Sequence, residues 1–168
     1  LQQHLAAHYQ TKVRVANPSA SGKDTCWVLS AIDNVVEPRP DLVIVAFGMN
    51  DAARRSAKEY QSNTKAVMAK IRERLPDAEF ILVASMLGNR NWTTLKHELF
   101  PQYRDALAEL GEPGIALADM TSLWTEFLKR KQDWDLTGNG VNHPNDFGHR
   151  VYAQVLSTLL VSPVDFKK

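Results

Sequence analysis

The chain has 168 residues, 44% of them hydrophobic. A single domain of this length buries about 70% of its extended surface. Twenty basic residues against 19 acidic ones leave a formal charge of +1, and no basic cluster is interleaved with aromatic residues. This composition argues against a nucleic-acid-binding surface, and the lack of an apolar run of about twenty residues argues against a membrane partner.

Cys26 is the only cysteine, so neither an intrachain disulfide nor a cysteine-based zinc site can form. Nothing in the chain resembles a signal peptide, and both a cytoplasmic and a secreted location remain open. The first ten residues, LQQHLAAHYQ, show a helical pattern without a capping residue before it. This start is typical of a sequence entered within a helix, so we expect a further segment upstream.

Short apolar runs alternate with helical patterns along the chain. The predicted strands are KVRVAN (12–17), DLVIVAF (41–47), EFILVAS (79–85) and GIALADM (114–120). The predicted helices cover residues 1–9, 25–36, 56–75, 101–110, 121–129 and 147–160. The nearly unbroken apolar runs 41–47 and 79–85 are typical of parallel strands buried on both faces. The alternation predicts an α/β fold with three α/β/α layers and a twisted parallel sheet in one domain.

Ligands of such sheets bind at the carboxyl ends of the strands, which directs attention to the loops there. In GMND (48–51), Gly48 permits a sharp turn and Asn50 can donate a side-chain N–H to an anion. In SGKD (21–24), the backbone N–H of Gly22 can do the same. Either motif taken alone is equally or better explained as an ordinary turn.

His143 lies in GVNHPNDFGH (140–149), where Pro144 fixes the following backbone and Asp146 is a candidate N-cap for the last helix. This arrangement holds an imidazole on a rigid support, as a general base requires.

Together, the strand followed by GMND, the upstream SGKD loop and the late HPNDFGH resemble the SGNH (GDSL-type) hydrolase superfamily of esterases and lipases. The resemblance implies a flavodoxin-like α/β/α fold, an oxyanion hole that includes Gly22 and Asn50, and His143 as catalytic base. DLVIVAFGMNDA and NHPNDFGHRVYA are also similar to bacterial carbohydrate esterases. The implied partner is a small-molecule or carbohydrate ester, and no metal or organic cofactor is needed.

Two departures from that family's pattern stand out. The Gly-Asp-Ser block that carries the nucleophile is absent, and Gly140 occupies the usual aspartate position three residues before His143. We therefore expect the fold to lack its first strand, with the serine upstream or the sheet completed by a second chain. The ring of His143 then works in a dyad or is oriented by a backbone carbonyl, Asp135 or Asp146.

Other polar loops offer weaker candidates. Ser19 and Ser21 lie near Gly22 but lack the strand-turn-helix setting of a nucleophile, so they are better explained as turn residues. Arg90 and Trp92 are candidates for lining a substrate pocket, although a loop tryptophan is as often a cover over the core. The sequence thus predicts a serine-type esterase for short acyl groups, with a non-catalytic binding fragment of the same fold as the alternative.

Overall fold

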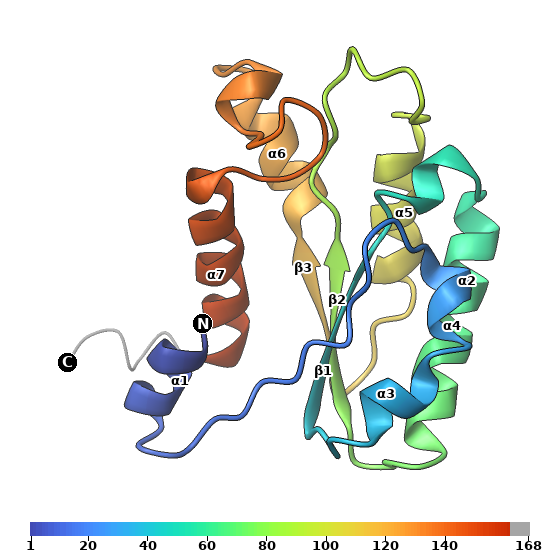
Figure 1. The fold of residues 1–168 in the computed structure, drawn as a ribbon, viewed down its shortest axis with the longest axis vertical. Coiled ribbons are helices and arrows are strands. Elements are labelled where there is room, and N and C mark those ends of the chain that lie inside the picture. Colours follow the sequence, from blue (N-terminus) through green and yellow to red (C-terminus); the bar gives the residue numbers. More distant parts are fainter. Residues whose placement is uncertain (162–168) are drawn as a thin grey trace.

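The computed structural model describes residues 1–161 as three parallel strands between two layers of helices (Figure 1). The strands are β1 (Leu42–Phe47), β2 (Glu79–Ala84) and β3 (Ile115–Asp119), in the order β1-β2-β3. Val45 lies opposite Leu82, and Leu82 opposite Leu117. The helices are α1 (Gln2–His8), α2 (Thr25–Val28), α3 (Ile32–Val36), α4 (Ala57–Arg72), α5 (Leu99–Ala108), α6 (Met120–Phe127) and α7 (Asp146–Leu160), and 3₁₀ turns cover η1 (Asp51–Ala53) and η2 (Asp133–Asp135). The predicted α/β architecture is confirmed.

The central strand β2 joins the two halves of the core. Phe80 and Leu82 point to the face covered by α2, α3, α4 and α5, whereas Ile81 and Val83 point to the face covered by α6 and α7. All four side chains are buried, as the alternation of side chains along a strand requires when both faces are covered. The prediction of burial on both faces is therefore right for β2.

The same prediction is wrong for β1. Val45 packs into the core, but Ile44 is 40% exposed and Ala46 is also exposed. The reason is position, because β1 pairs only with β2 within residues 1–161 and so forms the edge of the described sheet. An apolar edge strand with a free row of backbone groups is an unusual feature that proteins normally cover.

The predicted strand at 12–17 is also wrong, since residues 12–20 have no regular secondary structure. Val13 is half-buried and Val15 is 65% exposed, although the alternating KVRV pattern favours a strand. A strand needs hydrogen-bonding partners for its backbone groups, and none of the described strands pairs with this segment. The segment instead links α1, beside α7, to α2 on the opposite side of the sheet (Figure 1).

The predicted helix 25–36 is interrupted between α2 and α3. The Ser30 hydroxyl donates to the Trp27 carbonyl oxygen at 2.7 Å, a local bond that competes with the helical pattern. By contrast, α4 matches its prediction closely because Ser56 and Glu59 form a complete capping box at its start. Among residues 1–161, no helix combines the length and apolar character needed to cross a bilayer.

Candidate active site

The GMND loop and the SGKD loop meet at the carboxyl end of β1. Gly48 turns the chain with a φ of +118°, and the Asn50 side chain donates Nδ2–H to the Lys23 carbonyl oxygen at 3.0 Å. Neighbouring Gly22 has a φ of +72°, and no described group accepts a hydrogen bond from its backbone N–H. The Asn50 amide has two N–H groups, and only one hydrogen bond from them is formed among the described residues, so a second N–H is available to a ligand.

The His143 loop is organised by an asparagine that the sequence analysis overlooked. Asn139 Oδ1 accepts from three backbone N–H groups, those of Val141 (3.0 Å), Asn142 (2.9 Å) and His143 (3.1 Å). The Gly138 N–H donates to the His143 carbonyl oxygen at 2.8 Å and closes the loop. The backbone at His143 is therefore rigid, while its side chain is exposed.

The loop after β2 joins the His143 loop to the GMND loop. Asn89, in the loop after β2, donates two hydrogen bonds to the His143 loop. Its backbone N–H donates to the Val141 carbonyl oxygen and its Nδ2 donates to the Gly140 carbonyl oxygen, both at 2.7 Å. Gly88 lies between the two loops, because a methyl group there would be 3.4 Å from Met49 Sδ and 3.7 Å from the Val141 oxygen. The fold thus brings the loops of Gly22, Asn50 and His143 to one end of the sheet.

Comparison with known proteins identifies the family of this chain. Residues 1–151 match the model of the GDSL-like Lipase/Acylhydrolase family. The chain belongs to this family.

Solved structures of GDSL-like relatives share the fold. An acetylxylan esterase from Geobacillus stearothermophilus superimposes with a TM-score of 0.75 at 21% identity, covering 91% of this chain and 75% of that one. A putative GDSL-like lipase from Parabacteroides merdae superimposes with a TM-score of 0.77 at 17% identity, covering 92% and 77%. Structures of the Geobacillus esterase include variants described as catalytic mutants, in which a serine, an aspartate or a histidine becomes alanine. No curated protein gives a significant match.

Two buried tyrosines pack against the turn at Gly48. Tyr60 and Tyr103 stack with ring centroids 4.2 Å apart, and a methyl group on Gly48 would lie 3.5 Å from Tyr60 Oη. Burial, followed by the charge of nearby Asp51, raises the pKa of both hydroxyls. Both therefore stay neutral and donate to backbone carbonyls, Tyr60 to Phe47 (3.3 Å) and Tyr103 to Arg55 (2.7 Å).

The two acids considered for orienting His143 differ in their surroundings. Asp135 accepts from the Gln132 N–H at 2.8 Å in the cap of η2. Asp146 is not the N-cap of α7 as predicted, because Asn145 precedes the helix and accepts from the Gly148 N–H at 3.0 Å. Within residues 1–161, the ring of His143 makes no hydrogen bond or ion pair.

The candidates for substrate binding in this family member differ in their surroundings. Arg90 is paired with Asp133, its Nε and Nη2 each lying 3.0 Å from Oδ2. Trp92 is half-buried and packs against the core, the position expected of a cover. Ser19 and Ser21 are exposed in the segment before α2, outside any strand-to-helix turn.

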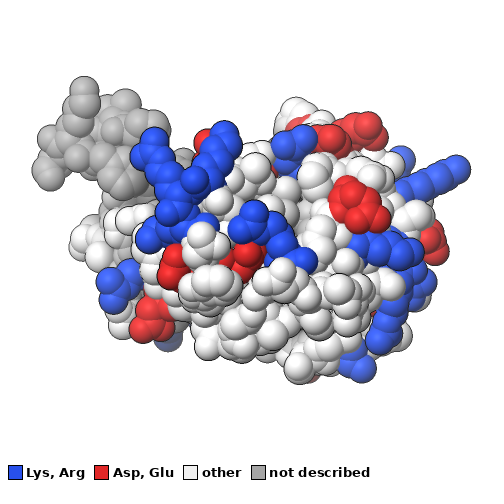
Figure 2. Space-filling model, turned by 90° about the horizontal axis from the view of Figure 1, so that it is seen from above, with Lys and Arg blue, Asp and Glu red and all other residues white. Residues whose placement is uncertain are grey.

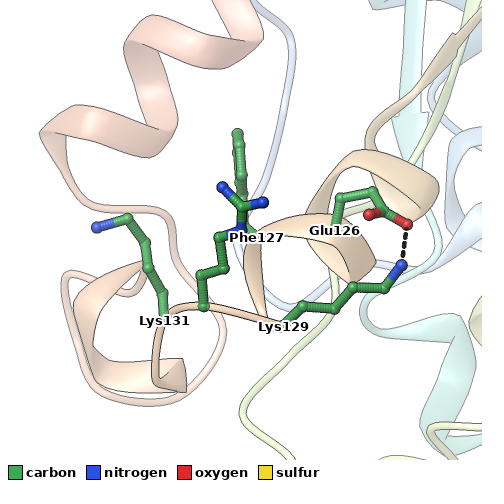
Figure 3. A pocket seen from close by; sticks show the side chains of 5 residues that line it. Glu126, Phe127, Lys129 and Lys131 are labelled. Atoms are coloured by element: carbon green, nitrogen blue, oxygen red, sulfur yellow. Dashed lines mark hydrogen bonds and ion pairs between the residues drawn. The ribbon is translucent and has the colours of Figure 1, made fainter.

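The end of the molecule that carries these loops has mixed charge. Figure 2 shows Lys and Arg side chains gathered next to Asp and Glu on part of this face, with a largely uncharged area in the lower half of the view. A hollow of about 300 Å³ at the carboxyl end of α6 is lined by Glu126, Phe127, Lys129, Arg130 and Lys131 (Figure 3). Lys129 reaches Glu126 at 2.6 Å, and the hollow includes none of the predicted site residues.

Proposed function

We propose that the protein is a serine-type ester hydrolase that acts on short acyl esters, with acetyl esters of carbohydrates as its substrate class. The observation that carries the proposal is the meeting of the Asn50 amide with the SGKD loop, which leaves an Asn50 N–H and the Gly22 N–H available to one oxyanion. Backbone and amide N–H groups of this kind stabilise the tetrahedral intermediate of acyl transfer. The His143 loop is bonded to the same end of the sheet through Asn89.

In the proposed mechanism, a serine attacks the ester carbonyl and His143 accepts the serine proton. Asn50 and Gly22 donate hydrogen bonds to the developing oxyanion. His143 then returns the proton to the leaving alcohol, and water hydrolyses the acyl-enzyme by the reverse sequence of proton transfers.

The nucleophile in this proposal comes from a segment upstream of this sequence. No Gly-Asp-Ser block occurs in the 168 residues. The open edge of β1, with Ile44 40% exposed, is suited to an added strand, whose carboxyl end would lie beside Asn50. We propose that this strand ends in the serine and completes one domain with residues 1–168, and that a second polypeptide is the alternative source.

A serine-histidine dyad fits the His143 loop better than a triad does. The catalytic aspartate of the Geobacillus esterase precedes its catalytic histidine by three positions, and Gly140 has that place here. Gly140 has a φ of +72°, a backbone conformation that side chains disfavour. The alternative to the dyad is that a backbone carbonyl, Asp135 or Asp146 orients the ring.

The substrate class is supported by similarity and by the polar loop after β2. The Geobacillus relative is described as an acetylxylan esterase. Among the described residues, the loop after β2 is polar (MLGNRNWTT) and differs from the long apolar cover that a lipase places over its site. Arg90 and Trp92 belong to this loop, and we propose that they border the alcohol side of the ester.

The alternative is a non-catalytic member of the family, favoured by the absence of both the serine block and the aspartate from this sequence. p-Nitrophenyl acetate hydrolysis distinguishes the two. We expect no activity from residues 1–168, activity from the chain extended upstream, and loss of that activity in the extended His143→Ala variant. Inactivity of the extended chain would favour the non-catalytic protein, and full activity of residues 1–168 would place the nucleophile at Ser19 or Ser21.

A further inference from the structure

A fully buried carboxylate lies directly beneath the proposed oxyanion hole. Asp51 has 0% exposure and follows Asn50 in the chain. Its Oδ2 accepts from the Gly48 N–H at 3.1 Å, and its Oδ1 accepts from the Thr25 N–H at 3.0 Å and the Thr25 hydroxyl at 2.5 Å. Asp51 therefore bonds its own turn and the start of α2, three residues after Gly22.

The hydrogen bonds continue from Thr25 into α4. Asn63 Nδ2 donates to Thr25 Oγ1 at 3.1 Å. Because an amide nitrogen can only donate, the single hydroxyl proton of Thr25 is directed to Asp51. Three elements distant in sequence are thus connected in one direction, from Asn63 on α4 through Thr25 on α2 to Asp51 in the GMND loop.

Burying the Asp51 carboxylate costs folding free energy, which argues that this side chain does more than fill space. Burial, the largest effect, raises the pKa of the Asp51 carboxyl, while the hydrogen bonds from Thr25 and Gly48 oppose it. A buried carboxylate is tolerated only when its oxygens are satisfied, and an apolar side chain would fill the same space without that cost. What a carboxylate adds is the ability to hold two separate backbone segments at a fixed distance.

We propose that Asp51, Thr25 and Asn63 form a clamp that sets the spacing between the Gly22 N–H and the Asn50 amide, which makes them positioning residues of the oxyanion hole. The proposal rests on the esterase function proposed above. The hydrogen bond from Asn50 to Lys23 joins the two loops at the surface, through a half-exposed side chain. The clamp joins the same loops through the buried side chains of Asp51 and Thr25. A displacement of about 1 Å in such a constellation can cost about a hundredfold in rate.

The test uses Thr25→Val in the upstream-extended protein, with Thr64→Val as the matched control. Both threonines are 1% exposed, but the Thr64 hydroxyl only donates to the Tyr60 carbonyl within α4, at 2.9 Å. We expect Thr25→Val to lower kcat by about tenfold to a hundredfold with KM nearly unchanged, since displaced donors weaken transition-state binding. Thr25→Ser keeps the hydroxyl and should restore kcat, and Thr64→Val should leave it unchanged. Equal losses in the two valine variants, or no loss in Thr25→Val, would overturn the clamp.

Amide hydrogen exchange tests the clamp in a measurement that does not depend on enzymatic activity. In the same proteins, Thr25→Val and Asn63→Ala should speed exchange of the Gly48 N–H by about tenfold or more, and Thr64→Val should not. If the extended wild-type chain is inactive, the esterase proposal fails while exchange still decides the clamp. If exchange at Gly48 is the same in Thr25→Val and Thr64→Val, the clamp fails even in an active enzyme.

Discussion

Replacing Asn50 by alanine separates the catalytic use of this side chain from its structural use. The side chain makes one hydrogen bond within the described protein, from Nδ2 to the Lys23 oxygen at 3.0 Å. The loss of one such bond costs about 1 kcal/mol of unfolding free energy. Removal of one oxyanion donor lowers turnover by about a hundredfold to a thousandfold, which corresponds to about 3 to 4 kcal/mol in the transition state. The effect on kcat/KM should therefore exceed the effect on stability by at least about 2 kcal/mol.

The assay is p-nitrophenyl acetate hydrolysis by the upstream-extended protein, combined with urea denaturation. Gln61→Ala is the control, because Gln61 Nε2 likewise donates to a backbone carbonyl, that of Ala106 at 2.9 Å, and also to Glu109 Oε2 at 2.7 Å, between α4 and α5, so its loss of stability should be at least as large. We expect the control to keep its kcat. A fall in kcat of less than about threefold in Asn50→Ala, where an oxyanion donor should be worth at least a hundredfold, would refute the assignment of Asn50.

Three further predictions concern the surroundings of the site. Gly140→Asp should lower the unfolding free energy by about 1 kcal/mol because of its left-handed backbone, without raising kcat; a tenfold gain would show that the new carboxylate orients His143. Trp92→Ala should lower the unfolding free energy by about 2 kcal/mol, roughly half the loss at a fully buried site, and raise KM because the side chain borders the alcohol side of the ester; an unchanged KM would show that Trp92 only covers the core. Burial acts to raise the pKa of Asp24, but hydrogen bonds from Arg55 and the Trp27 N–H outweigh it and lower that pKa below 3.8. Asp24→Ala should therefore lower the unfolding free energy by about 2 kcal/mol at pH 7, and its deficit relative to wild type should shrink as the pH falls below about 4. A deficit in urea denaturation that stays the same as the pH falls from about 7 to about 2 would contradict this.

Local sequence signals were sufficient for most elements of this fold. The apolar period of residues 56–75 predicts α4 within a few residues of its observed ends, and the capping box found in the structure at Ser56 explains where the helix begins. The run 79–85 predicts a strand buried on both faces, because every position from Phe80 to Ala84 is apolar. These signals work because caps and periodicity act over a few residues and do not depend on the rest of the chain.

The failures have two causes, a missing strand partner for one segment and a competing neighbour for one cap. KVRV alternates like a strand but pairs with none of the described strands, and Asp146 has the chemistry of a cap although Asn145 is the residue that accepts from Gly148. Asn139 and Gly88 gave no signal beyond ordinary loop composition. Their importance arises from contacts with segments that the sequence alone does not place.

The sequence by itself determined the family, the parallel α/β architecture and the three motifs of Gly22, Asn50 and His143, since each is written in consecutive residues. Only the tertiary structure decided how these motifs are held together: the Asn50 bond to Lys23, the Asn89 bonds to the His143 loop, and the buried bonds from Asn63 through Thr25 to Asp51. These bonds join residues 26 to 51 positions apart. Which donor meets which acceptor across such separations depends on the packing of helices against the sheet, and that packing is a property of the whole folded chain.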